Sequence, residues 1–234
     1  MKVVFDHSKP ETDHIRSFFF RAPESLKYTP GQFIELKLDH RDPDSRGQKR
    51  WFTLSSSPSE ELLAITTKLA SQRGSSFKRI LDSLQPGTEV DMVEPMGDFV
   101  LPKLIQTPLV FVAGGIGITP FRSMLKWLAD SREIRPIQLI YGVRSEDEIV
   151  FQKVFEEAGV HATIVVSEPS TTWGGERGRI NAELILGLTK PSEQTLIYVS
   201  GPEPMVEGLE KDLAASGLPK SRFVGDFFPG YSAI

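Results

Sequence analysis

The stretch LVFVAGGIGITP, residues 109–120, decides the fold of the second half of the chain. Its first five residues are apolar, which is typical of a buried strand in a parallel sheet. A glycine-rich turn follows, and a helical pattern then runs over residues 119–130. Pro120 suits the first helical turn, and Thr119 suits the N-cap position before it. The stretch therefore predicts a strand, a turn and a helix in direct succession.

The turn itself, Gly114-Gly115-Ile116-Gly117, has the character of a nucleotide-binding loop. Glycine lets the backbone approach a phosphate closely, and the N-terminus of the following helix supplies free N–H groups and partial positive charge. The third glycine of the usual dinucleotide fingerprint is absent, because Pro120 stands in its place. The alternative interpretation is a glycine-rich turn that binds no ligand.

The same alternation continues to the end of the chain. Further strands are predicted at residues 137–141, 162–166 and 195–199, and further helices at residues 148–158, 181–186 and 204–216. Buried strands that alternate with helices indicate a parallel sheet covered on both faces. The second half is therefore predicted to be an α/β nucleotide-binding domain.

The first hundred residues have a different pattern. Short strands are predicted at residues 18–20, 32–38, 50–54, 62–69 and 89–93, with one helix at residues 75–84. Turn residues such as Pro30-Gly31 and Pro86-Gly87 separate them, which favours an antiparallel barrel or sandwich. We expect two domains, residues 1–102 and 103–234, with the boundary in the interval 101–107.

Composition limits the chemistry. The 234 residues carry a net charge of −4, which gives no reason to expect a nucleic-acid partner. The absence of cysteine excludes disulfides, a catalytic thiol and cysteine-held zinc or iron–sulfur clusters. The four histidines have no metal-ligand spacing, so no metal site is expected. An organic cofactor must carry any electrons.

No targeting or membrane segment is predicted. The first residues contain no long apolar run before their charges, and residues 108–120 are too short to span a bilayer and are interrupted by glycines. We expect a cytoplasmic protein without a membrane span, and a monomer.

Four motifs in order carry a resemblance that covers nearly the whole chain. They are Arg50-Trp51-Phe52-Thr53, Gly74-Ser75-Ser76, residues 114–120 and Gly201-Pro202-Glu203-Pro204-Met205. Together they resemble the ferredoxin–NADP reductase superfamily. This resemblance implies a six-stranded antiparallel flavin barrel, followed by a five-stranded parallel nucleotide domain, in agreement with the organisation above.

The resemblance implies the flavin-binding residues. Arg50 would contact a cofactor phosphate, and Phe52, in place of the family's usual tyrosine, would pack against the isoalloxazine. Thr53 would offer its hydroxyl near flavin N5, and Leu54 and Ser55 would add only backbone contacts. The alternative interpretation of this motif is an ordinary strand with an exposed arginine and a buried phenylalanine.

Two other segments of the barrel are implied to hold the same cofactor. Thr66, Thr67 and Lys68 would supply further contacts from their strand. The N–H groups of Gly74-Ser75-Ser76 would hold the pyrophosphate of FAD, although FMN-using relatives exist. Simple N-capping by Ser75 or Ser76 is compatible with this role.

The nicotinamide site is implied in the second half. It comprises Gly114, Gly115, Gly117, Thr119, Pro120, Val143, Arg144, Gly201, Pro202 and Met205. Arg144 slightly favours NADPH over NADH, because arginine accommodates a 2′-phosphate. Arg177 and Arg179 would reinforce a phosphate site or remain solvated.

Three residues are implied to act at the reacting atoms. Ser200 replaces the family's common cysteine beside the nicotinamide, and Thr53 lies near flavin N5. Asp226 would complete a hydrogen-bond relay, while Phe227 or Phe228 covers the flavin. The alternative is that these aromatic residues only dock the terminus onto the core.

The expected function is therefore hydride transfer from NADPH or NADH to FAD. Electrons would then pass to a redox acceptor protein such as ferredoxin or flavodoxin, or to a small acceptor. One alternative is a flavin-binding electron-transfer subunit of a larger complex. Another is a nucleotide-binding regulator without flavin.

Overall fold

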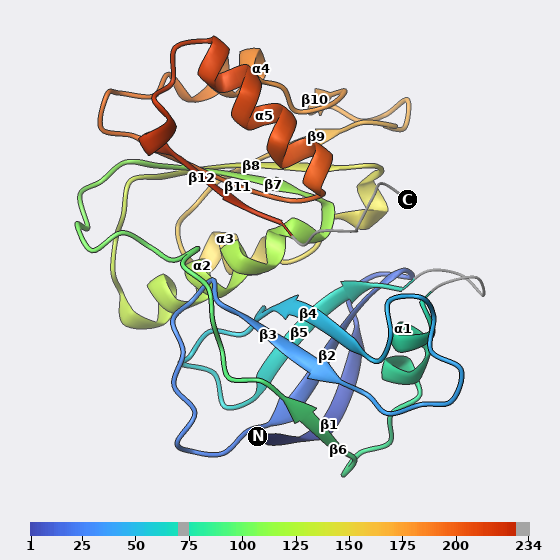
Figure 1. Cartoon of the computed structure of the whole chain (residues 1–234). Helices are drawn as coiled ribbons and strands as arrows, with labels where there is room; N and C mark the ends of the chain where they lie inside the picture. Colours follow the sequence, from blue (N-terminus) through green and yellow to red (C-terminus); the bar gives the residue numbers. More distant parts are fainter. Residues whose placement is uncertain (70–74, 228–234) are drawn as a thin grey trace.

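The N-terminal part of the computed structural model is a closed antiparallel barrel (Figure 1). The structure describes residues 1–69 and 75–227. The barrel strands are β1 (Lys2–Pro10), β2 (Ile15–Arg21), β3 (Phe33–Lys37), β4 (Lys49–Thr53), β5 (Leu63–Lys68) and β6 (Glu89–Met92). Their order is β4-β3-β6-β1-β2-β5, and a bridge between Leu54 and Ile65 joins the two edge strands. This single bridge is the one pairing between β4 and β5 in the described part of the chain, so the barrel closes at one point.

A phenylalanine-rich core fills the barrel. Phe18, Phe20 and Phe77 are fully buried within it. Phe77 comes from the helix α1 (Ser76–Asp82), which is shorter at both ends than the pattern predicted. The strand β1 was not predicted, although Val3 and Phe5 alternate with less buried residues, as in a strand with one core-facing side.

The C-terminal part is a parallel sheet of six strands. They are β7 (Leu109–Gly114), β8 (Ile137–Val143), β9 (Ala162–Val166), β10 (Glu176–Arg177), β11 (Leu196–Ser200) and β12 (Phe223–Asp226). The order is β10-β9-β8-β7-β11-β12, with every pair parallel. The sheet exceeds the expected five strands because the two-residue β10 pairs with the end of β9.

Helices cover both faces of this sheet. Figure 1 shows α2 (Thr119–Ser131) and α3 (Gln152–Glu157) on the face turned toward the barrel. The helices α4 (Ala182–Thr189) and α5 (Glu203–Ala215) cover the opposite face. The predicted combination of an antiparallel barrel and an α/β parallel-sheet unit is therefore confirmed. None of the helices within residues 1–69 and 75–227 is long and apolar enough to cross a membrane.

Two local predictions were wrong. Thr119 is not an N-cap, because it already has helical angles (φ −60, ψ −46) and continues a 3₁₀ turn over Gly115–Ile118. Its hydroxyl donates to the carbonyl of Ile116 at 3.1 Å. The helix predicted at residues 148–158 starts only at Gln152, because Phe151 has a left-handed backbone (φ 67) that interrupts the helical pattern.

Candidate functional site

The predicted nucleotide loop lies at the carboxyl ends of the parallel strands and against the barrel. The 3₁₀ turn Gly115–Ile118 contacts β5, the barrel strand that ends in Thr66, Thr67 and Lys68. Segments from the two halves of the chain, both predicted to bind cofactors, therefore meet at one junction. In open α/β sheets, this edge is where ligands bind.

Close packing explains two glycines of this loop, Gly117 against backbone and Gly114 against the side chain of Met205. A Cβ on Gly117 would lie 2.3 Å from the carbonyl oxygen of Ser200, and one on Gly114 would lie 2.3 Å from the sulfur of Met205. The loop and the segment Ser200-Gly201-Pro202 are thus packed against each other. Gly115 has φ +53, a conformation that favours glycine.

Ser200 and Asp226 are partners at the ends of two adjacent strands. They face each other in the register of β11 and β12, and the Ser200 hydroxyl donates to Asp226 Oδ2 at 3.4 Å. Burial raises the pKa of Asp226 from 3.8 to about 6, and the hydrogen bond from Ser200 opposes this only in part. Phe227 packs against the core of the second unit, and Phe228 lies outside the described residues.

Arg50 is buried, contrary to the alternative of an exposed arginine. Its side chain is 5% exposed. Nη1 donates to three carbonyls of the preceding turn, and Nη2 donates to Ser75 Oγ at 3.3 Å and Asp44 Oδ1 at 2.6 Å. Nε is buried without a hydrogen-bond partner among the described residues. The charge of Arg50 is thus paired with Asp44, but a buried N–H donor without an acceptor is costly, so Nε would be satisfied by an additional acceptor such as a phosphate oxygen.

Asp44 is a residue of this site that the sequence analysis missed. Its Oδ2 accepts from the backbone N–H of Ser76 at 3.0 Å, and its own N–H donates to Ser76 Oγ at 2.9 Å. Neither Ser75 nor Ser76 caps α1 through its side chain, so the carboxylate of Asp44 takes that role. The sequence did not indicate this role of Asp44, because Asp42-Pro43-Asp44 has the composition of an ordinary turn. Gly74, from the predicted pyrophosphate motif, lies outside the described residues.

Most of the remaining predicted flavin-binding residues of the barrel are buried, and Lys68 is the exposed one. Phe52, 6% exposed, packs in the barrel core against Phe77, with ring centroids 5.8 Å apart. The hydroxyl of Thr66 is bonded to Ser17 at 2.7 Å and to Ser55 at 2.9 Å. Thr53, Leu54 and Thr67 are buried, and Lys68 forms an ion pair with Glu148 of the other unit.

Arg144 lies just beyond β8 and is exposed. Its Nε forms an ion pair with Glu168 Oε2 at 2.9 Å, and 65% and 63% of the two side chains are exposed. Sequence analysis singled out Arg144 but not Glu168, which follows β9 and meets it only through the parallel register of the sheet. The arginine proposed to accept a 2′-phosphate therefore already has a carboxylate partner. Arg177 instead donates to the backbone carbonyls of Ser170 and Trp173.

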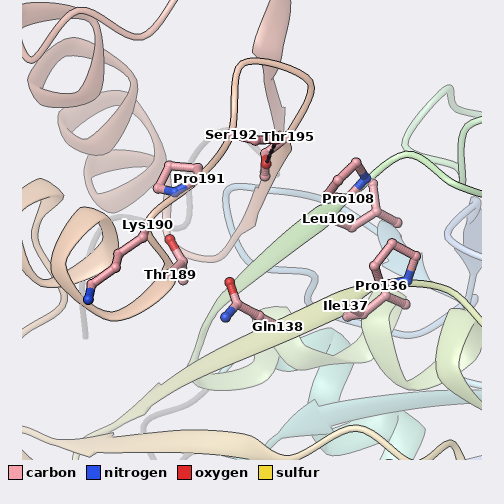
Figure 2. Close-up of a pocket in the computed structure, with 10 residues that line it drawn as sticks. All are labelled: Pro108, Leu109, Pro136, Ile137, Gln138, Thr189, Lys190, Pro191, Ser192 and Thr195. Atoms are coloured by element: carbon pink, nitrogen blue, oxygen red, sulfur yellow. Dashed lines mark hydrogen bonds between the residues drawn. The ribbon is translucent and has the colours of Figure 1, made fainter.

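A shallow cavity of about 380 Å³ lies elsewhere, at the amino ends of β7, β8 and β11 (Figure 2). Its lining includes Pro108, Pro136, Gln138 and Lys190, none of which was predicted as a site residue. No group of three or more potential metal ligands occurs in the described part of the chain.

Comparison with known proteins agrees with this geometry. Residues 111–211 match the oxidoreductase NAD-binding domain family. The chain is 31% identical over 238 residues to the stachydrine N-demethylase reductase subunit Stc4 of Rhizobium meliloti, covering 95% of this chain and 66% of that protein. It is 29% identical over 231 residues to the glycine betaine monooxygenase reductase subunit of Chromohalobacter salexigens, covering 93% and 61%. It therefore spans less than two thirds of either relative.

A solved structure has the same fold. The ferredoxin NADP+ reductase of Neisseria gonorrhoeae, with bound FAD and NADP, superposes with a TM-score of 0.79 at 20% identity. The match covers 97% of each chain, so both the barrel and the parallel-sheet unit are shared.

Proposed function

We propose that this chain belongs to the ferredoxin–NADP reductase superfamily and passes hydride from NADH or NADPH to bound FAD and electrons onward to a separate acceptor. The match of residues 111–211 to the oxidoreductase NAD-binding domain family and the shared fold of both units support this proposal. The observation that carries the proposal is the contact between the turn Gly115–Ile118 and β5. Cofactors held by these two segments would meet at the junction. We place the boundary between the FAD-binding and nicotinamide-binding domains at residues 102 and 103.

The barrel residues fit the phosphate-bearing part of the flavin. The buried Nε of Arg50 is a donor without a partner among the described residues, and the first turn of α1 begins beside it. Ser75 and Ser76, with Gly74, would provide the N–H groups for the pyrophosphate, which would replace Asp44 as the acceptor of the Ser76 N–H. Phe52 packs in the barrel core, so contact with the isoalloxazine would need its ring to turn outward. Thr66, Thr67 and Lys68 would add contacts from β5.

The flavin supplies the redox chemistry, since it accepts hydride and releases electrons singly or in pairs. The protein positions the reacting groups. Thr53 orients the flavin through its hydroxyl, and Ser200 borders the nicotinamide at the end of β11. Asp226 accepts a hydrogen bond from Ser200, and burial raises its pKa to about 6, so it would exchange a proton just below neutral pH. Phe227 or Phe228 would cover the flavin.

The nicotinamide is held by the loop and by neighbouring strand ends. The contacts come from Gly114, Gly115, Gly117, Thr119, Pro120, Val143, Gly201, Pro202 and Met205. Arg144 is the candidate for the adenosine ribose, and its pairing with Glu168 favours NADH over NADPH. A carboxylate beside the ribose binds a free 2′-hydroxyl and repels a 2′-phosphate.

The acceptor that we favour is the oxygenase component of a two-component system. Two relatives are the reductase subunits of a demethylase and of a monooxygenase. The second candidate is a subunit that transfers electrons only within a larger complex, which the partial coverage of these relatives favours. Reduction of a dye by the isolated chain would distinguish an independent reductase from such a subunit.

The first experiment identifies the flavin. Purified protein should be yellow, and chromatography of heat-released cofactor should yield FAD. FMN as the main species would contradict the assignment of the pyrophosphate site. Colourless, correctly folded protein that takes up no added flavin would contradict the proposed function.

The second experiment tests Thr53. Replacing Thr53→Ala should leave flavin bound but slow its reduction, because a misplacement of roughly 1 Å can cost about a hundredfold in rate. Ser200→Cys restores the commoner family residue and should be tolerated. Rapid mixing with NADH isolates this step from the acceptor. Parental reduction rates in Thr53→Ala would show that the site is misplaced.

A further inference from the structure

The first turn of α2, which follows the nucleotide loop, is hydrogen-bonded to the barrel. Its residue Arg122 lies three positions beyond Thr119, within one helical turn. Arg122 Nη1 donates to the carbonyl of Ser55 at 2.8 Å, and Nη2 donates to Glu60 Oε1 at 2.8 Å. A further bond to Glu60 Oε2 makes this ion pair bidentate. Such a planar fork fixes orientation as well as distance.

The next residue of α2 strengthens this attachment. Ser123 is fully buried, and its hydroxyl donates to the carbonyl of Ser56 at 2.5 Å. On the barrel side, Ser56 Oγ accepts from the N–H of Ala64 at 2.8 Å and is bonded to the hydroxyl of Tyr28 at 2.9 Å. The segment after Thr53 is therefore held by α2 on one side and by the barrel on the other.

Glu60 links the ion pair to the same segment. Its Oε2 accepts from the backbone N–H of Ser57 at 2.7 Å, which closes the turn between the two residues. The Arg122 guanidinium also lies 5.7 Å from the ring centroid of Phe151, which belongs to the second unit. Only 15% of the Arg122 side chain and 25% of the Glu60 side chain are exposed. Water therefore screens this pair less than an exposed one.

We infer that Arg122, paired with Glu60, is a positioning residue that sets the spacing between the flavin strand and the nicotinamide loop. The inference rests on the proposed function. Ser55 stands two residues after Thr53, and the loop Gly115–Ile118 runs directly into α2. One short stretch of helix thus joins the two segments that must hold the reacting rings face to face. Arg122 acts on alignment through the carbonyl of Ser55 and the carboxylate of Glu60, and no cofactor contact is assigned to its own side chain.

The test compares Arg122→Ala with Lys126→Ala, a control one turn further along α2. The ion pairs of Lys126 are with Asp130 and Glu157 in helices of the second unit, and its link to the barrel is indirect, through the hydrogen bond from Ser59 to Asp130. In cofactor-free protein, amide hydrogen exchange should accelerate in Arg122→Ala at both residues 53–57 and residues 114–119. Lys126→Ala should leave the exchange of residues 53–57 unchanged.

Rapid mixing of the flavin-loaded variants supplies the second measurement. Arg122→Ala should retain flavin and bind nicotinamide with nearly unchanged affinity. Its limiting rate of flavin reduction should fall about tenfold to a hundredfold, with a weaker charge-transfer absorbance between the stacked rings. Arg122→Lys should recover only part of the rate, since lysine lacks the bidentate fork.

Three results would overturn the inference. The first is parental exchange of residues 53–57 in Arg122→Ala. The second is a parental reduction rate. The third is a loss of nicotinamide affinity without a loss of rate. If Arg122→Ala does not fold, Glu60→Gln keeps the side-chain size and weakens the same pair. Absence of flavin from the parental protein would contradict the proposed function instead, while the exchange measurement would still decide whether α2 holds residues 53–57.

Discussion

Asp44 holds the guanidinium of Arg50 through a 2.6 Å bond between Oδ1 and Nη2, while its Oδ2 accepts from the first N–H of α1. Burial alone would favour the neutral acid. However, hydrogen bonds from the amides of Arg46 and Ser76, together with the charge of Arg50, hold the pKa of Asp44 well below its ordinary value. An ionised carboxylate of the protein therefore occupies donors that suit a cofactor phosphate.

Asp44→Asn should consequently tighten FAD binding and destabilise the cofactor-free protein. Removing one negative charge from a partly buried anion site is worth about tenfold in affinity. The same change leaves buried Arg50 without its counter-ion, so the melting temperature without FAD should fall. Titration of apoprotein with FAD and thermal unfolding measure the two effects. Asp39→Asn is the control, because Asp39 pairs with Lys37 at the surface. Weaker FAD binding in Asp44→Asn would show that Asp44 serves to orient Arg50.

Glu168→Gln should lower the KM for NADPH, because it releases Arg144 from its ion pair, and raise the KM for NADH, because it removes the carboxylate proposed to bind the free 2′-hydroxyl. Arg144→Ala should do the opposite, raising the KM for NADPH. A lost charge-assisted contact is worth roughly 1.5–3 kcal/mol, or about tenfold to a hundredfold in affinity. A variant with both Glu168→Gln and Arg144→Ala should not show the lower KM for NADPH that Glu168→Gln alone gives. Equal changes in the KM values for NADPH and NADH would show that Arg144 and Glu168 do not determine the choice between the two nicotinamides.

Asp226 should make stability depend on pH. Because burial raises its pKa from 3.8 to about 6, the folded state holds this proton more tightly than the unfolded state. The stabilising effect is complete below about pH 4 and is lost as the pH rises through about 6. Asp226→Asn, which resembles the protonated acid, should therefore melt higher than the parent at pH 8 and equally at pH 4.

The matched control for this comparison is Asp212→Asn, on the exposed side of α5. The difference in melting temperature between Asp212→Asn and the parent protein should be the same at pH 4 and at pH 8. A difference for Asp226→Asn that does not change between pH 4 and pH 8 would contradict the raised pKa.

Gly117→Ala should destabilise the protein by roughly 1–3 kcal/mol, the usual cost of overpacking. The added Cβ would meet the carbonyl oxygen of Ser200 at 2.3 Å and its carbon at 2.5 Å, and neither backbone atom can rotate away. Nicotinamide binding should weaken as the loop moves. Gly208→Ala, in open space within α5, should instead stabilise by about 0.5–1 kcal/mol. Urea unfolding measures both, and parental stability in Gly117→Ala would refute the close approach.

Local patterns in the sequence were sufficient for most of the fold. The apolar run before Gly114 and the helical spacing after Pro120 depend on neighbouring residues, so both were predicted correctly. The four ordered motifs also indicated the family. The strand β1 was missed because charged residues interrupt its alternation, and it is stabilised by its partners β2 and β6. The roles of Thr53, Ser200 and Asp226 stay predictions.

The sequence by itself thus determined the two kinds of unit and the residue types available for cofactor binding. Tertiary structure alone decided that Asp44 pairs with Arg50, that Glu168 pairs with Arg144 and that Arg122 reaches Glu60. None of these partners has a local signature, because an acidic residue in a turn looks the same whether it is solvated or buried. Ion pairs across loops and strands depend on where the chain brings distant segments together, and burial then sets their strength.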